Sequence, residues 1–168
     1  MKARRVGMLA LSALIGLTLA VIAAQPASAH TPTASARVYD TYGLCTISWS
    51  QIAHDHATGQ TTASAHTYAR VANCTTIDMF APGHLAVRLD LQKWTRAGWV
   101  NCQSTDWVYN STWNDEIRTS RLYGANRPDC DGTANDGPGY FRTQGVSYVW
   151  DGSAWRGGAT QSGYHYLP

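Results

Sequence analysis

Charged residues are scarce in this sequence, and two kinds are almost missing. Its 168 residues include only 13 Lys or Arg and 11 Asp or Glu. After residue 29 there is one lysine, Lys93, and one glutamate, Glu116. Both residue types are good helix formers on exposed faces, so their shortage disfavours long surface helices and favours strands and turns.

The basic charge is concentrated at the start of the chain. Basic residues at positions 2, 4 and 5 precede an apolar run over 6–24, and residues 27–29, Ala-Ser-Ala, form a small-x-small cleavage site. We therefore expect a signal peptide over 1–29 and a secreted, extracellular protein that starts at His30. From His30 on, 10 scattered basic residues face 11 acidic ones, a net charge of −1. Neither a nucleic-acid partner nor a membrane partner is therefore expected.

Catalytic motifs are also missing. The sequence has no GxSxG, HExxH or CxxC pattern, which disfavours serine hydrolases of the α/β class, zinc proteases and thioredoxin-like or zinc-binding cysteine pairs. A small secreted ribonuclease remains an alternative, with Glu116 and a histidine in acid–base roles and Arg118 or Arg121 binding phosphate. We nevertheless expect a protein that is not an enzyme.

Four cysteines are present, Cys45, Cys74, Cys102 and Cys130. An even count in an exported protein predicts two disulfides, and four cysteines allow three pairings. We favour the pairing of neighbours in the sequence, Cys45–Cys74 and Cys102–Cys130. Each bond would close a loop of about 30 residues and contribute on the order of 3–4 kcal/mol.

Short strand-like segments with turn signals between them dominate the rest of the chain. The expected strand regions are 37–52, 63–72, 85–94, 99–102, 107–109, 140–151 and 153–157. Residues 114–123 fit a short helix or, almost as well, a strand. The pattern predicts an all-β fold, an antiparallel β-sandwich or small barrel over 37–168, with two disulfides and at most one short helix. Residues 30–36 are expected to form an extended, mobile arm.

The clearest prediction is a hairpin over residues 84–102. Leu85, Val87, Leu89 and Leu91 alternate with polar residues, as in a strand with one buried face. A four-residue loop, Thr95 to Gly98, would place Leu91 opposite Cys102.

The same register places Trp94 opposite Trp99 on the other face of the hairpin, near Arg88 and Asp90. If that face is exposed, the two rings could form a protein interface or a platform for a sugar ring. The alternative is that a second layer of the fold covers them. The arm suggests a second binding mode, because a segment leading into Val38 and Tyr39 could add a strand to a partner's sheet. A frayed terminus is the simpler interpretation.

Two loops carry possible metal ligands. His54 and His56 could bind a metal, but a third ligand cannot be identified, so a polar hairpin loop is the preferred interpretation. A Gly-rich loop gathers oxygen ligands that calcium favours. These are Asp129, Asp131, Asn135 and Asp136. Since the spacing of a known calcium loop is absent, no cofactor is expected.

The alanine-rich signal, the use of arginine in place of lysine and the four-cysteine β domain are similar to small exported proteins of high-GC Gram-positive bacteria. Within that group, size, cysteine count and the leading arm resemble the adaptor subunit of umbrella toxin particles, which links a long scaffold to a lectin-bearing subunit. The resemblance implies a secreted, non-catalytic binding or adaptor domain in a toxin-like assembly, with another secreted protein as partner. A carbohydrate-binding module and a small secreted hydrolase are the alternatives.

Overall fold

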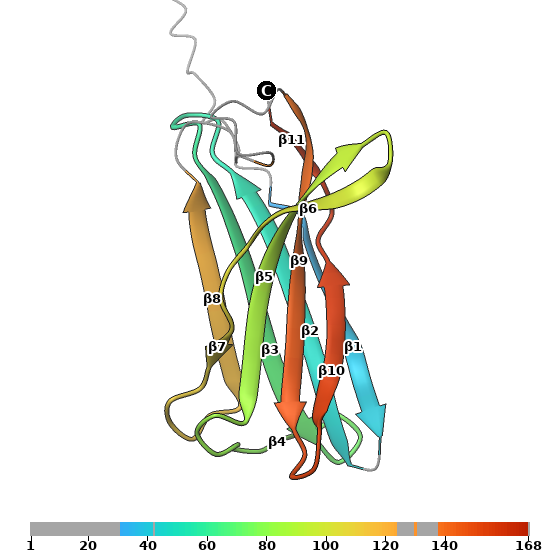
Figure 1. The fold of residues 1–168 in the computed structure, drawn as a ribbon. Coiled ribbons are helices and arrows are strands. Elements are labelled where there is room, and N and C mark those ends of the chain that lie inside the picture. Colours follow the sequence, from blue (N-terminus) through green and yellow to red (C-terminus); the bar gives the residue numbers. More distant parts are fainter. Residues whose placement is uncertain (1–30, 42, 124–129, 131–137, 168) are drawn as a thin grey trace, which may run out of the picture.

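The computed structural model describes residues 31–41, 43–123, 130 and 138–167. The predicted signal peptide and the four possible calcium ligands, Asp129, Asp131, Asn135 and Asp136, lie outside these residues. The described part contains eleven strands and no helix, arranged as two antiparallel sheets (Figure 1). The predicted all-β sandwich is therefore confirmed. Within these ranges, no helix is long and apolar enough to cross a membrane.

One sheet has five strands. Its strands are β1 (Thr33–Thr41), β2 (Leu44–His54), β3 (Thr61–Val71), β4 (Thr76–Ile77) and β8 (Glu116–Tyr123). They lie in the order β1-β2-β3-β4, and β8 also pairs with β3. Since β2 and β3 pair over eleven residues, this long hairpin forms the centre of the sheet.

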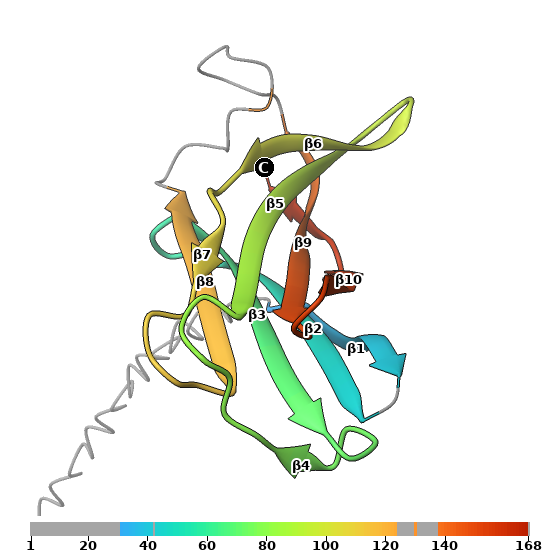
Figure 2. The ribbon, with the colours of Figure 1, turned by 60° about the horizontal axis from the view of Figure 1, so that its bottom comes forward.

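The other sheet has six strands. They are β5 (Leu85–Thr95), β6 (Gly98–Ser104), β7 (Val108–Tyr109), β9 (Gly139–Trp150), β10 (Trp155–Gln161) and β11 (His165–Leu167). The order is β10-β9-β5-β6, with β7 paired to β5 and β11 paired to β9. Figure 2 shows this sheet stacked on the five-stranded one. Its outer face, which points away from the five-stranded sheet, carries the candidate site.

The apolar side of β5 forms the centre of the core. Leu85, Val87, Leu89 and Leu91 are fully buried, as their alternation predicted. They belong to one cluster with Phe141 of β9 and apolar residues of the facing sheet. Burying such side chains stabilises the fold by about 1.5–3 kcal/mol each.

The inner face of β2 is polar because the two sheets approach closely there. A Cβ atom at Gly145 of β9 would lie 2.7 Å from the Trp49 carbonyl oxygen. Only small side chains fit, and Thr46 and Ser48 are fully buried. Their hydroxyls donate to the carbonyls of Arg156 at 2.9 Å and Gly145 at 3.0 Å. These hydrogen bonds offset the cost of burying the polar groups.

The start of the domain differs from the prediction. The single strand region expected over 37–52 is two strands, β1 and β2, which run antiparallel. Gly43 lies just before β2 with φ of +94°, a conformation that glycine adopts without steric cost. Residues 33–36, expected to belong to a mobile arm, pair with Ser48–Gln51 as the first half of β1. The residue pattern carries no signal of this pairing, because Thr, Ala and Ser show no apolar alternation.

Two further expectations needed correction. Residues 116–123 form a strand, β8, rather than the short helix considered as an alternative, because they pair along β3.

In the β5–β6 hairpin, Thr95 pairs with Gly98, so the loop has two residues rather than four. Leu91 lies opposite Gln103, not Cys102, since Cys102 is the extra residue of a β-bulge.

Both predicted disulfides are confirmed, Cys45–Cys74 and Cys102–Cys130. The first holds an unusual turn after β3. Ala72, Asn73 and Cys74 have φ angles of 49°, 59° and 65°, in the left-handed region. Such angles cost about 1–2 kcal/mol for residues with a Cβ atom. The Ala72 amide donates to the Gly43 carbonyl at 3.0 Å, so the turn is fixed at both ends.

Candidate functional site

The tip of the β5–β6 hairpin projects beyond the body of the sandwich (Figure 1). Pairing between β5 and β9 ends at Lys93 and Phe141, whereas β5 and β6 continue to pair through Trp94↔Trp99. The two tryptophan rings meet edge to face, with centres 5.4 Å apart. Trp94 is 51% exposed. The predicted pair therefore exists, and no second layer covers Trp94 in the described part of the chain.

Residues from distant parts of the sequence complete an aromatic surface around this pair. They line a pocket of about 540 Å³, which we call the hairpin surface. Its residues are Trp94, Trp99, Tyr140, Arg142, Ser162 and Tyr164. The guanidinium of Arg142 lies 4.3 Å from the centre of the Trp99 ring, a cation–π contact. Tyr164 is 64% exposed. Of these six residues, the sequence indicated a binding role for the two tryptophans alone.

A chain of amides orients Arg142. Its Nε donates to Gln92 Oε1 at 2.8 Å. Gln92 Nε2 in turn donates to Asn101 Oδ1 at 2.7 Å and to Gln144 Oε1 at 2.6 Å. Burial lowers the pKa of Arg142, although a guanidinium remains charged at neutral pH. The cation is therefore held in one position beneath the exposed rings.

Arg88 and Asp90 lie elsewhere, contrary to the expectation that they flank the tryptophans. Arg88 Nη2 donates to Asp90 Oδ2 at 2.9 Å, and the Asp90 side chain is almost fully buried. The Arg88 guanidinium lies 5.0 Å from the ring centre of Trp107. Arg88 and Asp90 do lie on the same outer face as the two tryptophans, as expected. Both are nearer the middle of β5, however, and neither lines the pocket of the hairpin surface.

A second aromatic group lies on the same outer face, near the far end of the sheet. Neighbouring rings in this group are 5.7–5.9 Å apart. Its members are Trp107, Tyr109, Tyr148, Trp150 and Trp155. With the hairpin pair, four of the seven tryptophans lie in strands of this sheet, and Trp107 directly precedes β7. Trp150 and Trp155 are cross-strand partners on either side of the Asp151-Gly152 turn. Their positions around this turn are a sequence signal that could have predicted their contact.

Val38 and Tyr39 lie on the edge strand β1, at the opposite end of the sandwich from the hairpin tip. Val38 is the bulged residue of β1 and faces Gly158 of β10. Tyr39 lies 5.8 Å beneath the Arg156 guanidinium and lines a pocket of about 850 Å³. The same pocket includes Trp113, which is largely exposed. The structure therefore separates these two residues from the hairpin surface.

The only glutamate does meet a histidine and an arginine on the outer face of the five-stranded sheet. His66 Nδ1 lies 3.3 Å from Glu116 Oε1, and Arg118 forms two hydrogen bonds to the same carboxylate. His66 Nδ1 is also 3.1 Å from the Tyr68 hydroxyl. Arg121, the other predicted phosphate ligand, instead lies over the ring of Tyr123.

Charge and burial shift the pKa values in this group. Burial and then the charge of Arg118 lower the pKa of His66, although Glu116 opposes them. Burial raises the pKa of Glu116, but the hydrogen bond and charge of Arg118 and the charge of His66 outweigh it and give a net lowering. Near neutral pH this favours a neutral imidazole beside an ionised carboxylate.

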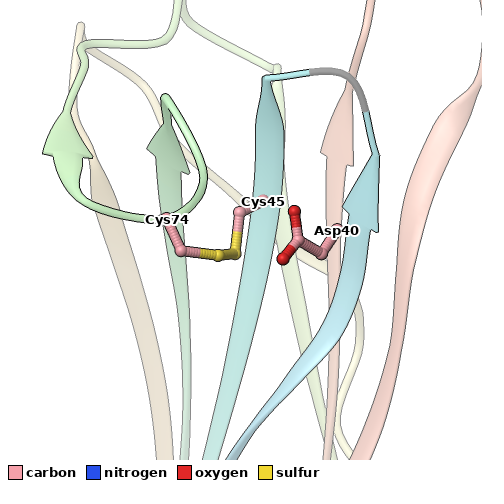
Figure 3. A group of neighbouring side chains, drawn as sticks. All are labelled: Asp40, Cys45 and Cys74. Atoms are coloured by element: carbon pink, nitrogen blue, oxygen red, sulfur yellow. A yellow bond between two sulfur atoms is a disulfide. The ribbon is translucent and has the colours of Figure 1, made fainter.

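One carboxylate lies beside two cysteine sulfurs, an arrangement that can resemble a metal site. Figure 3 shows Asp40 next to Cys45 and Cys74. The two sulfurs are bonded to each other, so neither provides the thiolate that a metal ion needs. This group is therefore part of the disulfide rather than a metal centre.

The described surface thus offers an exposed aromatic pocket, a second aromatic group and an ion-paired His–Glu–Arg cluster. No protein-family model, curated protein or solved structure matches this chain.

Proposed function

We propose that this chain is a secreted, non-catalytic adaptor domain that binds another extracellular protein through the hairpin surface. The observation that carries the proposal is the exposed aromatic pocket at a projecting hairpin tip, with Arg142 fixed beneath it. Tryptophan, tyrosine and arginine are the residues that most often dominate the energy of protein interfaces. Their rings give a large contact area and lose little conformational freedom on binding.

A protein fits this surface better than a sugar does. A sugar ring needs several free hydrogen-bonding groups around the aromatic platform. Here Arg142 Nε already donates to Gln92, and Ser162 Oγ accepts from the Thr143 amide and donates to the Gly163 carbonyl. The tyrosine hydroxyls and indole N–H groups provide the remaining polar contacts, which suits the mostly apolar centre of a protein interface.

An adaptor needs a second surface, and the pocket of about 850 Å³ at the opposite end provides a candidate. Its lining includes Met79 and Trp113, both largely exposed, and Tyr39. Two partners could bind at opposite ends without colliding. This arrangement supports an adaptor that links two proteins, the role implied by the resemblance to umbrella toxin adaptors.

The contact between His66 and Glu116 supports a role without catalysis. In cleavage of a phosphodiester, the general acid and the general base act on different oxygens of one phosphate. Here His66 and Glu116 contact each other at 3.3 Å and Arg118 donates to the same carboxylate, so each of the three groups already has a partner within the cluster. We assign the cluster a structural role on the surface of the five-stranded sheet.

The decisive experiment identifies what co-purifies with the exported protein by mass spectrometry of culture supernatant. The Trp94→Ala variant is expected to lose a specific protein partner that the unmodified chain retains. Trp155→Ala is the matched control, because it removes an exposed tryptophan from the same sheet but outside the hairpin surface. Equal recovery of the partner with both variants would contradict the proposal.

A carbohydrate-binding module is the second candidate, favoured by the pocket shape and by the pair of tilted rings at its wall. Retention on a polysaccharide resin tests it directly. If sugars bind at the hairpin surface, Trp94→Ala and Trp99→Ala should abolish retention, and unchanged retention would exclude this site.

A further inference from the structure

Three histidines meet at the end of the sandwich where the β2–β3 loop approaches β11, near the top of Figure 1. The ring centres of His54 and His56 are 4.9 Å apart. His165 lies 5.2 Å from His54 and 5.7 Å from His56, also between ring centres. Half of the six histidines in the sequence therefore lie in one cluster.

We propose that His54, His56 and His165 bind a divalent transition-metal ion of the zinc and copper class. Imidazole nitrogens coordinate zinc at about 2.0–2.1 Å, and near-tetrahedral angles then place the ring centres about 5 Å apart. The three observed separations are close to this value. The ring nitrogens lie further apart in the structure than in a formed metal site, so binding requires the His56 and His165 rings to turn about their side-chain bonds while Thr61 holds the His54 ring.

The surroundings of His54 suit a metal ligand. His54 is almost fully buried, and its Nδ1 lies 2.9 Å from the Thr61 hydroxyl. With Nδ1 protonated and donating to Thr61, Nε2 carries the lone pair that a metal accepts. Ligating histidines usually have such a partner on the second nitrogen, because it fixes the tautomer and the ring orientation.

The loop that carries His56 is held in place by its own hydrogen bonds. Asp55 accepts from the Ala57 amide and from the Thr58 hydroxyl, both at 2.8 Å. The Gly59 amide donates to the Asp55 carbonyl at 2.7 Å. These bonds occupy the Asp55 carboxylate, and the cluster itself offers three imidazoles. Imidazole sets select zinc, copper and nickel over calcium and magnesium.

A three-histidine set leaves one position of a four-coordinate ion for water or an external group. His56 is exposed, so the cluster borders solvent. The sequence could not reveal this site because His165 follows His56 by about 110 residues, and only the pairing of β11 with β9 brings it back.

Isothermal titration of the mature full-length chain with Zn²⁺ and with Cu²⁺ tests the proposal. We expect one ion per chain, and at least tenfold weaker binding in each of the variants His56→Gln and His165→Gln. Thr61→Val should weaken binding by about 10- to 100-fold, the usual effect of losing a group that orients a ligand. Both histidine variants alter exposed or half-buried side chains, and circular dichroism verifies that they fold.

Two controls separate this site from other metal-binding groups. His84→Gln removes a histidine outside the cluster and should leave the affinity unchanged. Because a chain that starts with His30 has an amino group and an imidazole that bind copper, His30→Ala is measured in parallel. In NMR spectra, Zn²⁺ should shift the ring signals of His54, His56 and His165 but not those of His66 or His84. Binding that survives His56→Gln and His165→Gln, or that is absent from the unmodified chain, would overturn the proposal.

Discussion

The guanidinium of Arg142 stacks on Trp99 while its Nε donates to Gln92, so one side chain connects the aromatic pocket to the polar network of the sheet. We expect Arg142→Lys to weaken partner binding by about tenfold, or about 1.4 kcal/mol, because an ammonium cannot both stack and form the directed hydrogen bond. Arg121→Lys alters a stacked arginine outside both proposed surfaces and serves as the control. Titration of the identified partner gives both affinities, and equal losses would contradict the assignment.

Gly145→Ala should destabilise the fold by about 1–3 kcal/mol, since its Cβ would press on the Trp49 carbonyl at 2.7 Å and force the sheets apart. Gly139→Ala makes the same change on the same strand, where the nearest atom is the flexible end of Lys93 at 3.2 Å. Its effect should stay within about 0.5 kcal/mol. Urea denaturation measures both. Similar losses in the two variants would contradict close sheet packing at Gly145.

Ala72→Gly should stabilise the protein by about 1 kcal/mol, because glycine adopts the left-handed angle of +49° without the steric cost that alanine carries. Ala97→Gly is the matched control. Ala97 lies in a turn and does not have a positive φ angle, so glycine should lower stability there by increasing the freedom of the unfolded chain. The free energies of unfolding, with both disulfides intact, decide between these outcomes.

Stability should fall as the pH drops from 7 to 5. The folded protein lowers the pKa of His66, mainly by burial, below the ordinary value of 6.5 that the unfolded chain retains. The unfolded state then binds more protons over this range, which favours unfolding as the pH falls. His66→Gln should flatten the dependence, and part should persist because burial also lowers the pKa of His54. Stability that rises on acidification would contradict this account.

The purified protein should leave RNA uncut, and Glu116→Gln should behave identically. Gel analysis of RNA incubated with each purified protein measures this. Cleavage that disappears in Glu116→Gln would show that the His66–Glu116–Arg118 cluster is an active site, and would remove the non-catalytic part of the proposed function.

Local signals in the sequence predicted the hairpin well. The alternation from Leu85 to Leu91 and the glycine-containing turn were sufficient to place Trp94 opposite Trp99. They did not predict the bulge at Cys102, because an inserted residue leaves the apolar pattern of β5 unchanged. The pairing of neighbours in the sequence also predicted both disulfides. For Cys45 and Cys74 the physical reason is the β2–β3 hairpin, which brings the start of β2 next to the end of β3.

Long-range contacts explain what the sequence could not reveal. Polar and apolar residues alternate in β2, but this alternation does not show which face packs against the other sheet. The polar face is the inner one because Gly145, about 100 residues later, lets the two sheets approach closely. Likewise, Arg142 and Tyr164 reach the tryptophans only through the pairing of β9 with β5 and the return of the chain after β10. Their spacing along the sequence carries no signal of that contact.

The extension of the β5–β6 hairpin past its last contact with β9 has a consequence for motion. Beyond Lys93, β5 and β6 pair only with each other among the described strands, and a two-stranded ribbon is marginally stable in water. Amides at the tip should therefore exchange with deuterium far faster than those of Val87 or Leu89. A binding surface that opens this readily can tilt Trp94 to match its partner, while Arg142 and the rigid sheet keep Trp99 in place.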